Sequence, residues 1–82
     1  MVTPESIQAS ILDNMACDTV EVAGDGHHFE ALVVSPAFRG LSRIQRHRLV
    51  YAALGDRMRE EIHALSMTTQ TPEERAAAQG AR

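Results

Sequence analysis

The chain has 82 residues, of which 44% are apolar and 4% aromatic, so its length supports one domain with a core of aliphatic and methionine side chains. Its single cysteine, Cys17, excludes an internal disulfide and a cysteine-only metal site within one chain, and it favours a reducing, cytoplasmic environment. The apolar runs are far shorter than the roughly 20 residues of a membrane span, and Met1 is not followed by a secretory leader. We therefore expect neither export nor membrane insertion.

The net charge of −3 is unevenly distributed along the chain. There is no lysine, and a basic stretch that contains only Asp56 as an acid holds Arg39, Arg43, Arg46, Arg48, Arg57 and Arg59. Every fixed positive side-chain charge is thus a guanidinium, which suits bidentate contact with a carboxylate or a phosphate.

The first elements are a predicted helix and a predicted hairpin. Thr3 is a candidate N-cap before Pro4, and apolar residues at helical spacing predict a helix over residues 4–16. Residues 19–23 alternate as a half-buried strand does, and Gly24-Asp25-Gly26 then breaks the pattern. The next strand, through Val34, places Phe29 on the buried side, so the two strands should form a hairpin.

The second half of the chain predicts a long helix and a third strand. Ser42 and Gln45 form a capping-box pattern, and the expected apolar stripe of the helix consists of Ile44, Tyr51, Leu54, Met58 and Ile62. Residues 63–69 alternate as a strand. A short, weakly ordered helix is expected over about 71–82. The chain is therefore predicted to be one α+β domain over residues 1–82, with helices on one face of a three-stranded sheet.

Four histidines are the residues most suited to metal binding. His47 lies among arginines and is interpreted as a surface residue. His27 and His28 lie at the glycine-bounded turn, and His63 opens the third strand. These imidazoles converge if the turn and the start of the third strand lie at the same end of the sheet. Two imidazoles leave a tetrahedral metal incomplete, so a partner would supply the remaining ligands.

The sequence also bears on two other classes of function, catalysis and nucleic-acid binding. The sequence contains no glycine-rich phosphate loop and no nucleophile with an obvious base, and a pair of Asp25 with His27 at a polar turn would be solvated, so we predict that the chain is not an enzyme. A nucleic-acid interface would use the guanidinium groups to neutralise phosphates. The acidic total and the few aromatics disfavour it, and a solvated basic face or a docking surface for an acidic protein fits at least as well. The arginines concerned are Arg39, Arg43, Arg46 and Arg48.

Several segments resemble the BolA-like family. Residues 29–42, FEALVVSPAFRGLS, followed by residues 45–50, QRHRLV, resemble its central segment. Residues 62–66, IHALS, with residues 71–74, TPEE, resemble its closing strand and tail. The similarity spans nearly the whole chain.

This resemblance implies a class II KH-like fold of αββαβ order and a monothiol glutaredoxin partner with a shared [2Fe-2S] cluster. In that family the histidine that opens the last strand is a ligand, which carries onto His63. The second ligand comes from the loop before the second strand, where one subgroup has a cysteine and this chain has His27 and His28. His28, directly before the aromatic residue, is favoured, with His27 as the competitor, and Cys17 is interpreted as structural.

Two functions follow as expectations. The first is a non-enzymatic adaptor that binds a monothiol glutaredoxin, ligates the bridging [2Fe-2S] cluster together with glutathione and the partner, and serves iron–sulfur trafficking or iron sensing. The second is a KH-like nucleic-acid-binding transcriptional regulator. The free protein is expected to be a monomer or a weak homodimer.

Overall fold

A computed structural model describes residues 2–60, 62 and 64–80. Along the chain the elements are α1 (Pro4–Asn14), β1 (Thr19–Gly24), β2 (His28–Val34), the 3-10 helix η1 (Pro36–Phe38), α2 (Arg43–Leu54), α3 (Arg57–Glu60), β3 (Ala64–Gln70) and α4 (Pro72–Gly80). Among the described residues, no helix has both the length and the apolar character that crossing a membrane requires.

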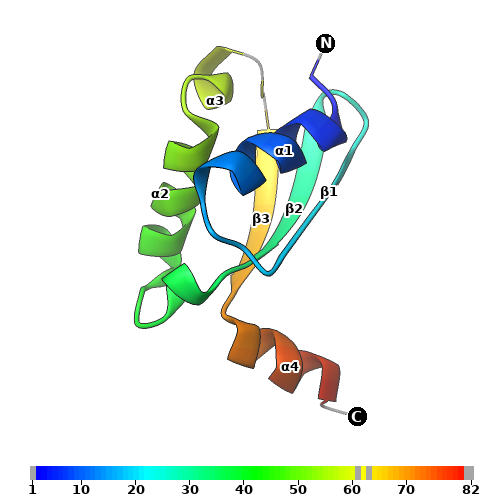
Figure 1. Cartoon of the computed structure of the whole chain (residues 1–82). Coiled ribbons are helices and arrows are strands. Elements are labelled where there is room, and N and C mark those ends of the chain that lie inside the picture. The colour runs from blue at the N-terminus through cyan, green and yellow to red at the C-terminus, as the bar shows by residue number, and fades with distance from the viewer. Residues whose placement is uncertain (1, 61, 63, 81–82) are drawn as a thin grey trace.

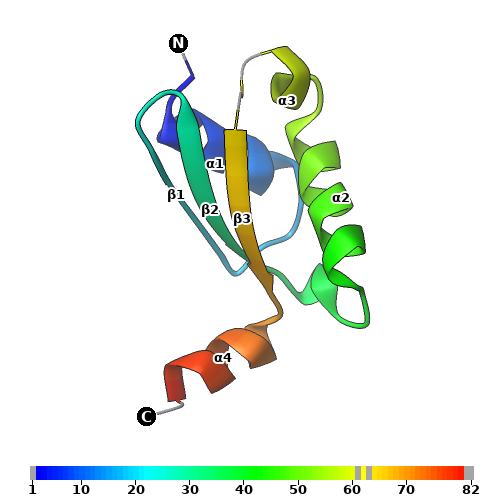
Figure 2. The same cartoon turned by 180° about the vertical axis from the view of Figure 1, so that it is seen from behind.

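The three strands form one sheet in the order β1, β2, β3. β1 runs antiparallel to β2, which confirms the predicted hairpin, and β2 runs parallel to β3. Helices α1 and α2 lie on one face of this sheet, and α4 lies beyond its lower end (Figures 1 and 2). The other face carries no helix over most of its length, and we call it the open face. The predicted α+β class, element order and one-sided helical layer are confirmed.

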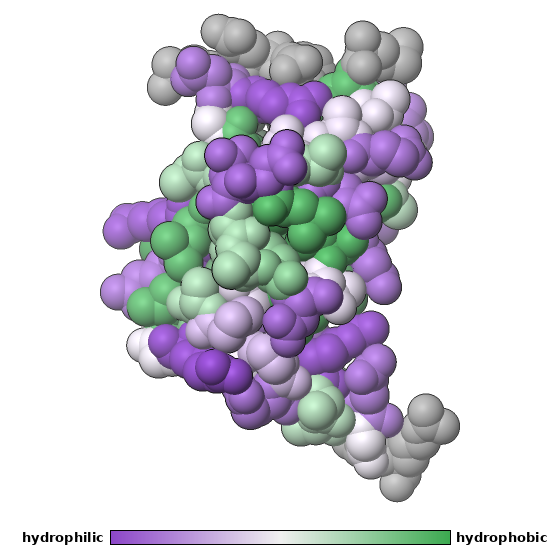
Figure 3. Space-filling view, viewed as in Figure 1, coloured by the Kyte–Doolittle hydropathy of each residue, from purple (hydrophilic) through white to green (hydrophobic). Residues whose placement is uncertain are grey.

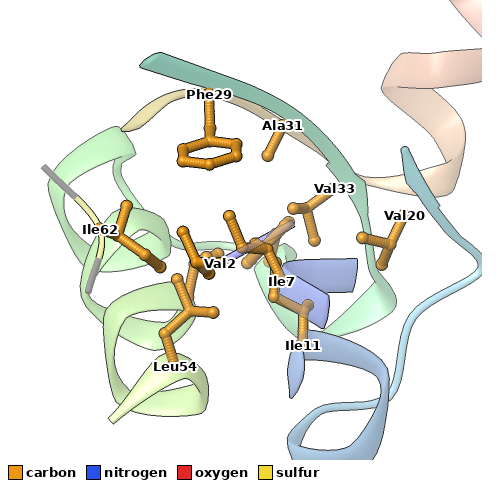
Figure 4. Packing of buried hydrophobic residues seen from close by; sticks show 11 residues of the cluster. Val2, Ile7, Ile11, Val20, Phe29, Ala31, Val33, Leu54 and Ile62 are labelled. Atoms are coloured by element: carbon orange, nitrogen blue, oxygen red, sulfur yellow. The ribbon is translucent and has the colours of Figure 1, made fainter. Parts of the chain in front are cut away.

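The core lies between the sheet and the helices. Phe29 projects from β2 toward Ile7 of α1 and toward Leu54 and Ile62 (Figure 4). Each fully buried aliphatic or phenylalanine side chain contributes about 1.5–3 kcal/mol through removal of apolar surface from water. The predicted inward parity of β2 is confirmed, because Phe29, Ala31 and Val33 are all buried.

Side chains cap the two main helices as the sequence predicts. The Thr3 hydroxyl accepts a hydrogen bond from the Ser6 amide at 3.1 Å, and the Ser42 hydroxyl accepts one from the Gln45 amide at 3.2 Å. The Gln45 side chain in turn accepts from the Ser42 amide, which completes the predicted capping box. These bonds fix where α1 and α2 begin.

The prediction of one long helix is wrong, because two helices, α2 and α3, take its place. Its predicted apolar stripe is confirmed in part, since Leu54 and Ile62 are buried and Met58 packs against the core. The helix α2 ends at Leu54 because Gly55 adopts a φ of +61°, a left-handed conformation that glycine tolerates and other residues disfavour. Its buried residues are Val50, Ala53 and Leu54. Ile44 and Tyr51 lie roughly 100° around the helix from Val50 and are 64% and 40% exposed.

Ile44 and Tyr51 are two of several exposed large apolar side chains on the helices. The exposed large apolar side chains of the described residues are Leu12 on α1 and Ile44, Leu49 and Tyr51 on α2. Apolar surface gathers near the middle of this face and is bordered by polar side chains (Figure 3).

Arg46 joins four parts of the fold. Its guanidinium donates to the Leu41 carbonyl at 3.0 Å and the Thr69 carbonyl at 3.4 Å, and it binds both carboxylate oxygens of Glu74 at 2.6 and 3.2 Å. It also lies 5.9 Å from the centroid of the Phe38 ring. The side chain is only 14% exposed. Arg46 therefore links η1, α2, β3 and α4 through its side chain.

A second guanidinium holds α4 from the loop after η1. Arg39 donates to both carboxylate oxygens of Glu73 at 2.9 and 2.6 Å. This contact is the main reason why the pKa of Glu73 falls to about 2. The helix expected after residue 71 is present over Pro72–Gly80, and its predicted weak order stays a prediction.

We expect Arg46→Ala to lower the free energy of unfolding by about 1–3 kcal/mol, because it leaves two backbone carbonyls without their donor and removes a charge-assisted contact. Urea unfolding followed by circular dichroism measures this. Arg48→Ala, on the same helix and exposed, is the matched control and should change stability by less than about 0.5 kcal/mol. Equal losses of unfolding free energy in the two variants would contradict this linking role of Arg46.

Candidate metal-binding site at the hairpin turn

The turn between β1 and β2 is held by the carboxylate of Asp25. One of its oxygens accepts hydrogen bonds from the backbone amides of His27 and His28, both at 2.9 Å. The Asp25 amide donates to the His28 carbonyl at 3.2 Å, and Gly26 supplies a φ of +99°. The carboxylate thus contacts the backbone of both histidine residues.

Gly24 sets how closely the turn packs on the core. A Cβ built at this position would collide with the Phe29 ring and with the His28 carbonyl oxygen. Phe29 is 1% exposed and cannot retreat without opening the core. The absence of a side chain at position 24 therefore lets the turn fold directly against the start of β2.

His28 lies on the open face at the beginning of β2. Because successive side chains of a strand point to opposite faces, the inward Phe29 directs His28 outward, and its side chain is exposed. In the parallel register, His28 is paired with Ala64, the first residue of β3. His28 also lines a surface hollow together with Glu30, Ala64 and Ser66.

Two members of this hollow were not among the predicted site residues. Glu30 is two positions beyond His28, so it shares the open face, and Ser66 enters from β3. The spacing of His28 and Glu30 was available in the sequence. The contribution of Ser66 was not, because it depends on which strands pair.

His63, the other predicted ligand, lies outside the described residues. It directly precedes Ala64 in the sequence, and Ala64 is the residue that pairs with His28. His27 is described and is exposed at the turn. Within the described parts of the chain, no three histidine, cysteine, aspartate or glutamate side chains are grouped so as to hold a metal ion.

The remaining cysteine and histidine lie elsewhere. Cys17 is half-buried against the core just before β1, which begins opposite Val34, and so it lies at the far end of the sheet from His28. Burial, with a smaller contribution from Asp18, raises the pKa of the Cys17 thiol. His47 is half-buried on α2, beside Met67 of β3.

The predicted arginine group is divided by the structure. Arg39 and Arg46 bind glutamates of α4, as described above, whereas Arg43 and Arg48 are exposed on α2. Arg57 is bonded to α1, where it donates to the Ser6 carbonyl at 2.9 Å and to the Ser10 hydroxyl at 2.6 Å. Part of the basic stretch therefore stabilises the fold.

The turn should lose its order in acid. The backbone hydrogen bonds of His28 and His27 lower the pKa of Asp25 below its ordinary value of 3.8. The stabilisation is therefore complete above pH 3.8 and is lost as the pH falls through the lowered pKa. An NMR titration should show the His27 and His28 amides shifting with a midpoint below 3.8, and Asp25→Ala should remove this transition. A midpoint at or above 3.8 would contradict the contact.

Comparison with known proteins places these features in a family. The family profile described as BolA-like protein matches residues 4–74. BolA-like protein 1 of Bos taurus is 49% identical over 49 residues, which make up 60% of this chain and 36% of that protein. The chain thus matches only about a third of the length of this relative.

Two further comparisons cover most of both chains. Acid stress protein IbaG of Escherichia coli strain K12 is 35% identical over 69 residues, 83% of this chain and 82% of that protein. The solved structure of a BolA protein homologue from Coxiella burnetii has a TM-score of 0.80 and 47% identity, and the match covers 93% of this chain and 99% of that one. The resemblance expected from the sequence is confirmed, and the chain belongs to the BolA-like family.

Proposed function

We propose that this chain is a non-enzymatic adaptor that binds a monothiol glutaredoxin in the cytoplasm and ligates a bridging [2Fe-2S] cluster together with that partner. The observation that carries the proposal is the register of β2 and β3. It pairs His28 with Ala64, the immediate chain neighbour of His63. His28 thus lies at the end of the sheet where β3 begins, and the residue that precedes Ala64 in the sequence, 35 positions after His28, is His63.

The donor chemistry of His28, together with that of His63 in the sequence, fits one half of such a cluster. His28 is exposed on the open face, and its backbone amide is held by Asp25, so the ring is not required to support the turn. His28 and His63 would bind one iron through neutral imidazole nitrogens. The cysteine of the partner and the thiolate of glutathione would bind the other iron, since this chain has no second cysteine to offer beside Cys17.

When bound, the cluster would combine thiolate ligands on one iron with imidazole ligands on the other, and such mixed ligation raises the reduction potential relative to all-cysteine clusters. The chain itself contributes the positions of its donors. Asp25 and Gly24 hold the turn against Phe29, and the ladder with β3 holds the turn beside Ala64. A site of this kind holds some of the cluster ligands in place, and the partner supplies the rest. This arrangement suits an adaptor in iron–sulfur trafficking or iron sensing.

The proposal is tested by mixing the protein with a cluster-loaded monothiol glutaredoxin and recording visible absorption and circular dichroism. The wild-type chain should alter both spectra. His63→Ala and His28→Ala should each abolish the change, because one iron loses a ligand. His27→Ala should retain it, since His28 is the favoured ligand.

The matched control is His47→Ala, which removes a histidine of α2 that lines a different hollow from His28 and should leave the spectral change intact. If His28→Ala behaves as wild type and His27→Ala abolishes the change, the second ligand is His27. If His63→Ala keeps the full change, the proposed ligation is wrong.

Fewer arginines are available for the nucleic-acid-binding alternative than the sequence suggested. Arg39 and Arg46 already bind carboxylates of α4, which leaves Arg43 and Arg48 as the members of the predicted set that pair with no carboxylate among the described residues. Few phosphate contacts predict weak binding with a shallow dependence on salt. Tight binding of DNA that weakens steeply with salt and is lost in Arg43→Ala would favour the alternative.

A further inference from the structure

The strand β3 has an unpaired edge. Among the described residues it pairs only with β2, and Figure 2 shows it between β2 and α2. The Gln70 carbonyl accepts from the Ser35 amide on the β2 side, whereas the Thr69 carbonyl accepts from Arg46 of α2. Because the backbone groups of a strand alternate between its two edges, Met67 shares the orientation of Thr69 and directs its N–H and C=O away from β2.

A groove runs between this edge and the first half of α2. We call it the β3 groove, and it is lined by Leu41, Arg43, His47, Met67 and Thr69, with Arg46 at its end. Leu41 and Met67 are half-buried and give it an apolar part. It therefore places backbone donors and acceptors beside an apolar surface, which is the combination that strand-addition sites use to bind extended peptides.

The charge of the β3 groove is positive. Arg43 is exposed, and no acid in the described parts of the chain pairs with it. His47 adds an imidazole to the lining, while the guanidinium of Arg46 is already neutralised by Glu74. A guanidinium without a partner suits a carboxylate, as the pairs of Arg39 and Arg46 with α4 illustrate in the same molecule.

We propose that the β3 groove binds an extended segment of a partner protein that carries an acidic side chain. The segment adds to β3 as a fourth strand through the N–H and C=O of Met67 and the N–H of Thr69. A carboxylate on its helix side pairs with Arg43, and an apolar neighbour contacts Leu41 and Met67. The Thr69 carbonyl is occupied by Arg46, which ends the added strand at that point.

The lining favours a peptide over a single-stranded nucleic acid. Among the described residues, the imidazole of His47 is the only aromatic ring that lines the groove and could stack on a base, whereas the edge of β3 offers the regular donors and acceptors of a peptide partner. The groove is also separate from the histidine site, since Met67 lies three residues, or roughly 10 Å, along β3 from Ala64. Both sites can therefore be occupied together.

The test titrates a heptapeptide with blocked termini into the ¹⁵N-labelled full chain. The peptide has threonine at its first, third, fifth and seventh positions, with valine, glutamate and valine between them. The Met67 and Thr69 amides should shift, with affinity in the range measurable at about 1 mM peptide. Two further peptides carry N-methyl groups on backbone amides, the first peptide on its threonines and the second on its remaining residues. Only one of these two peptides should bind, because every second amide of an added strand faces β3 and a methyl group there removes its donor.

Arg43→Glu should weaken binding about tenfold by placing like charges together. Arg48→Glu makes the same charge change on the same helix outside the groove and should weaken binding less than about twofold. The proposal is overturned by unshifted Met67 and Thr69 amides at the highest peptide concentration, by equal binding of the two N-methylated peptides, or by equal losses in the two variants. Tighter binding of a thymidine oligonucleotide at the same amides would likewise overturn it and assign the groove to nucleic acid.

Discussion

The parallel pairing of β2 with β3 is the constraint on which the rest of the molecule depends. Parallel neighbours cannot be joined by a tight turn, so the chain must cross over between them, and here η1, α2 and α3 make that crossing. The crossing places α2 against the core and beside the free edge of β3. The same pairing opposes Ala64 to His28. A slip of one residue would turn every side chain of β3 to the opposite face, so burial of its inward residues maintains this alignment.

The arginines show how one residue type serves both the fold and its surface. A lysine in place of Arg46 would offer one compact ammonium group, whereas the planar guanidinium reaches two carbonyls, a carboxylate and an aromatic ring at once. Arg57 links α3 to α1 in a similar way. The basic composition of this stretch therefore overstates the charge that is offered to partners. Arg43 and Arg48 are the members that α2 presents outward.

Local patterns in the sequence predicted the elements whose causes are local. The alternation of β1 and β2, the Thr3 and Ser42 caps and the glycine-rich turn each depend on neighbouring residues, and all are found in the structure. The end of α2 was missed because the predicted apolar stripe runs on from Leu54 to Met58 past Gly55, which takes a left-handed conformation that stops the helix.

Features that depend on distant parts of the chain were less predictable. The sequence allowed His28 to be assigned to the outward side of its strand, since Phe29 is inward, but it did not specify the residue opposite it. The pairs of Arg39 with Glu73 and Arg46 with Glu74 join positions 34 and 28 residues apart, and no local pattern indicates them. Ser66 entered the candidate site for the same reason, through a pairing between strands.

The contact of Arg46 with the Thr69 carbonyl has a consequence for solubility. An uncovered strand edge is a template on which identical chains can stack without limit, and natural proteins interrupt such edges with charge, a cover or a short strand. Here the guanidinium closes one end of β3, and α2 stands alongside it. The Thr69 carbonyl is therefore not free to bond to a neighbouring chain, and the length of edge on which identical chains could stack is reduced.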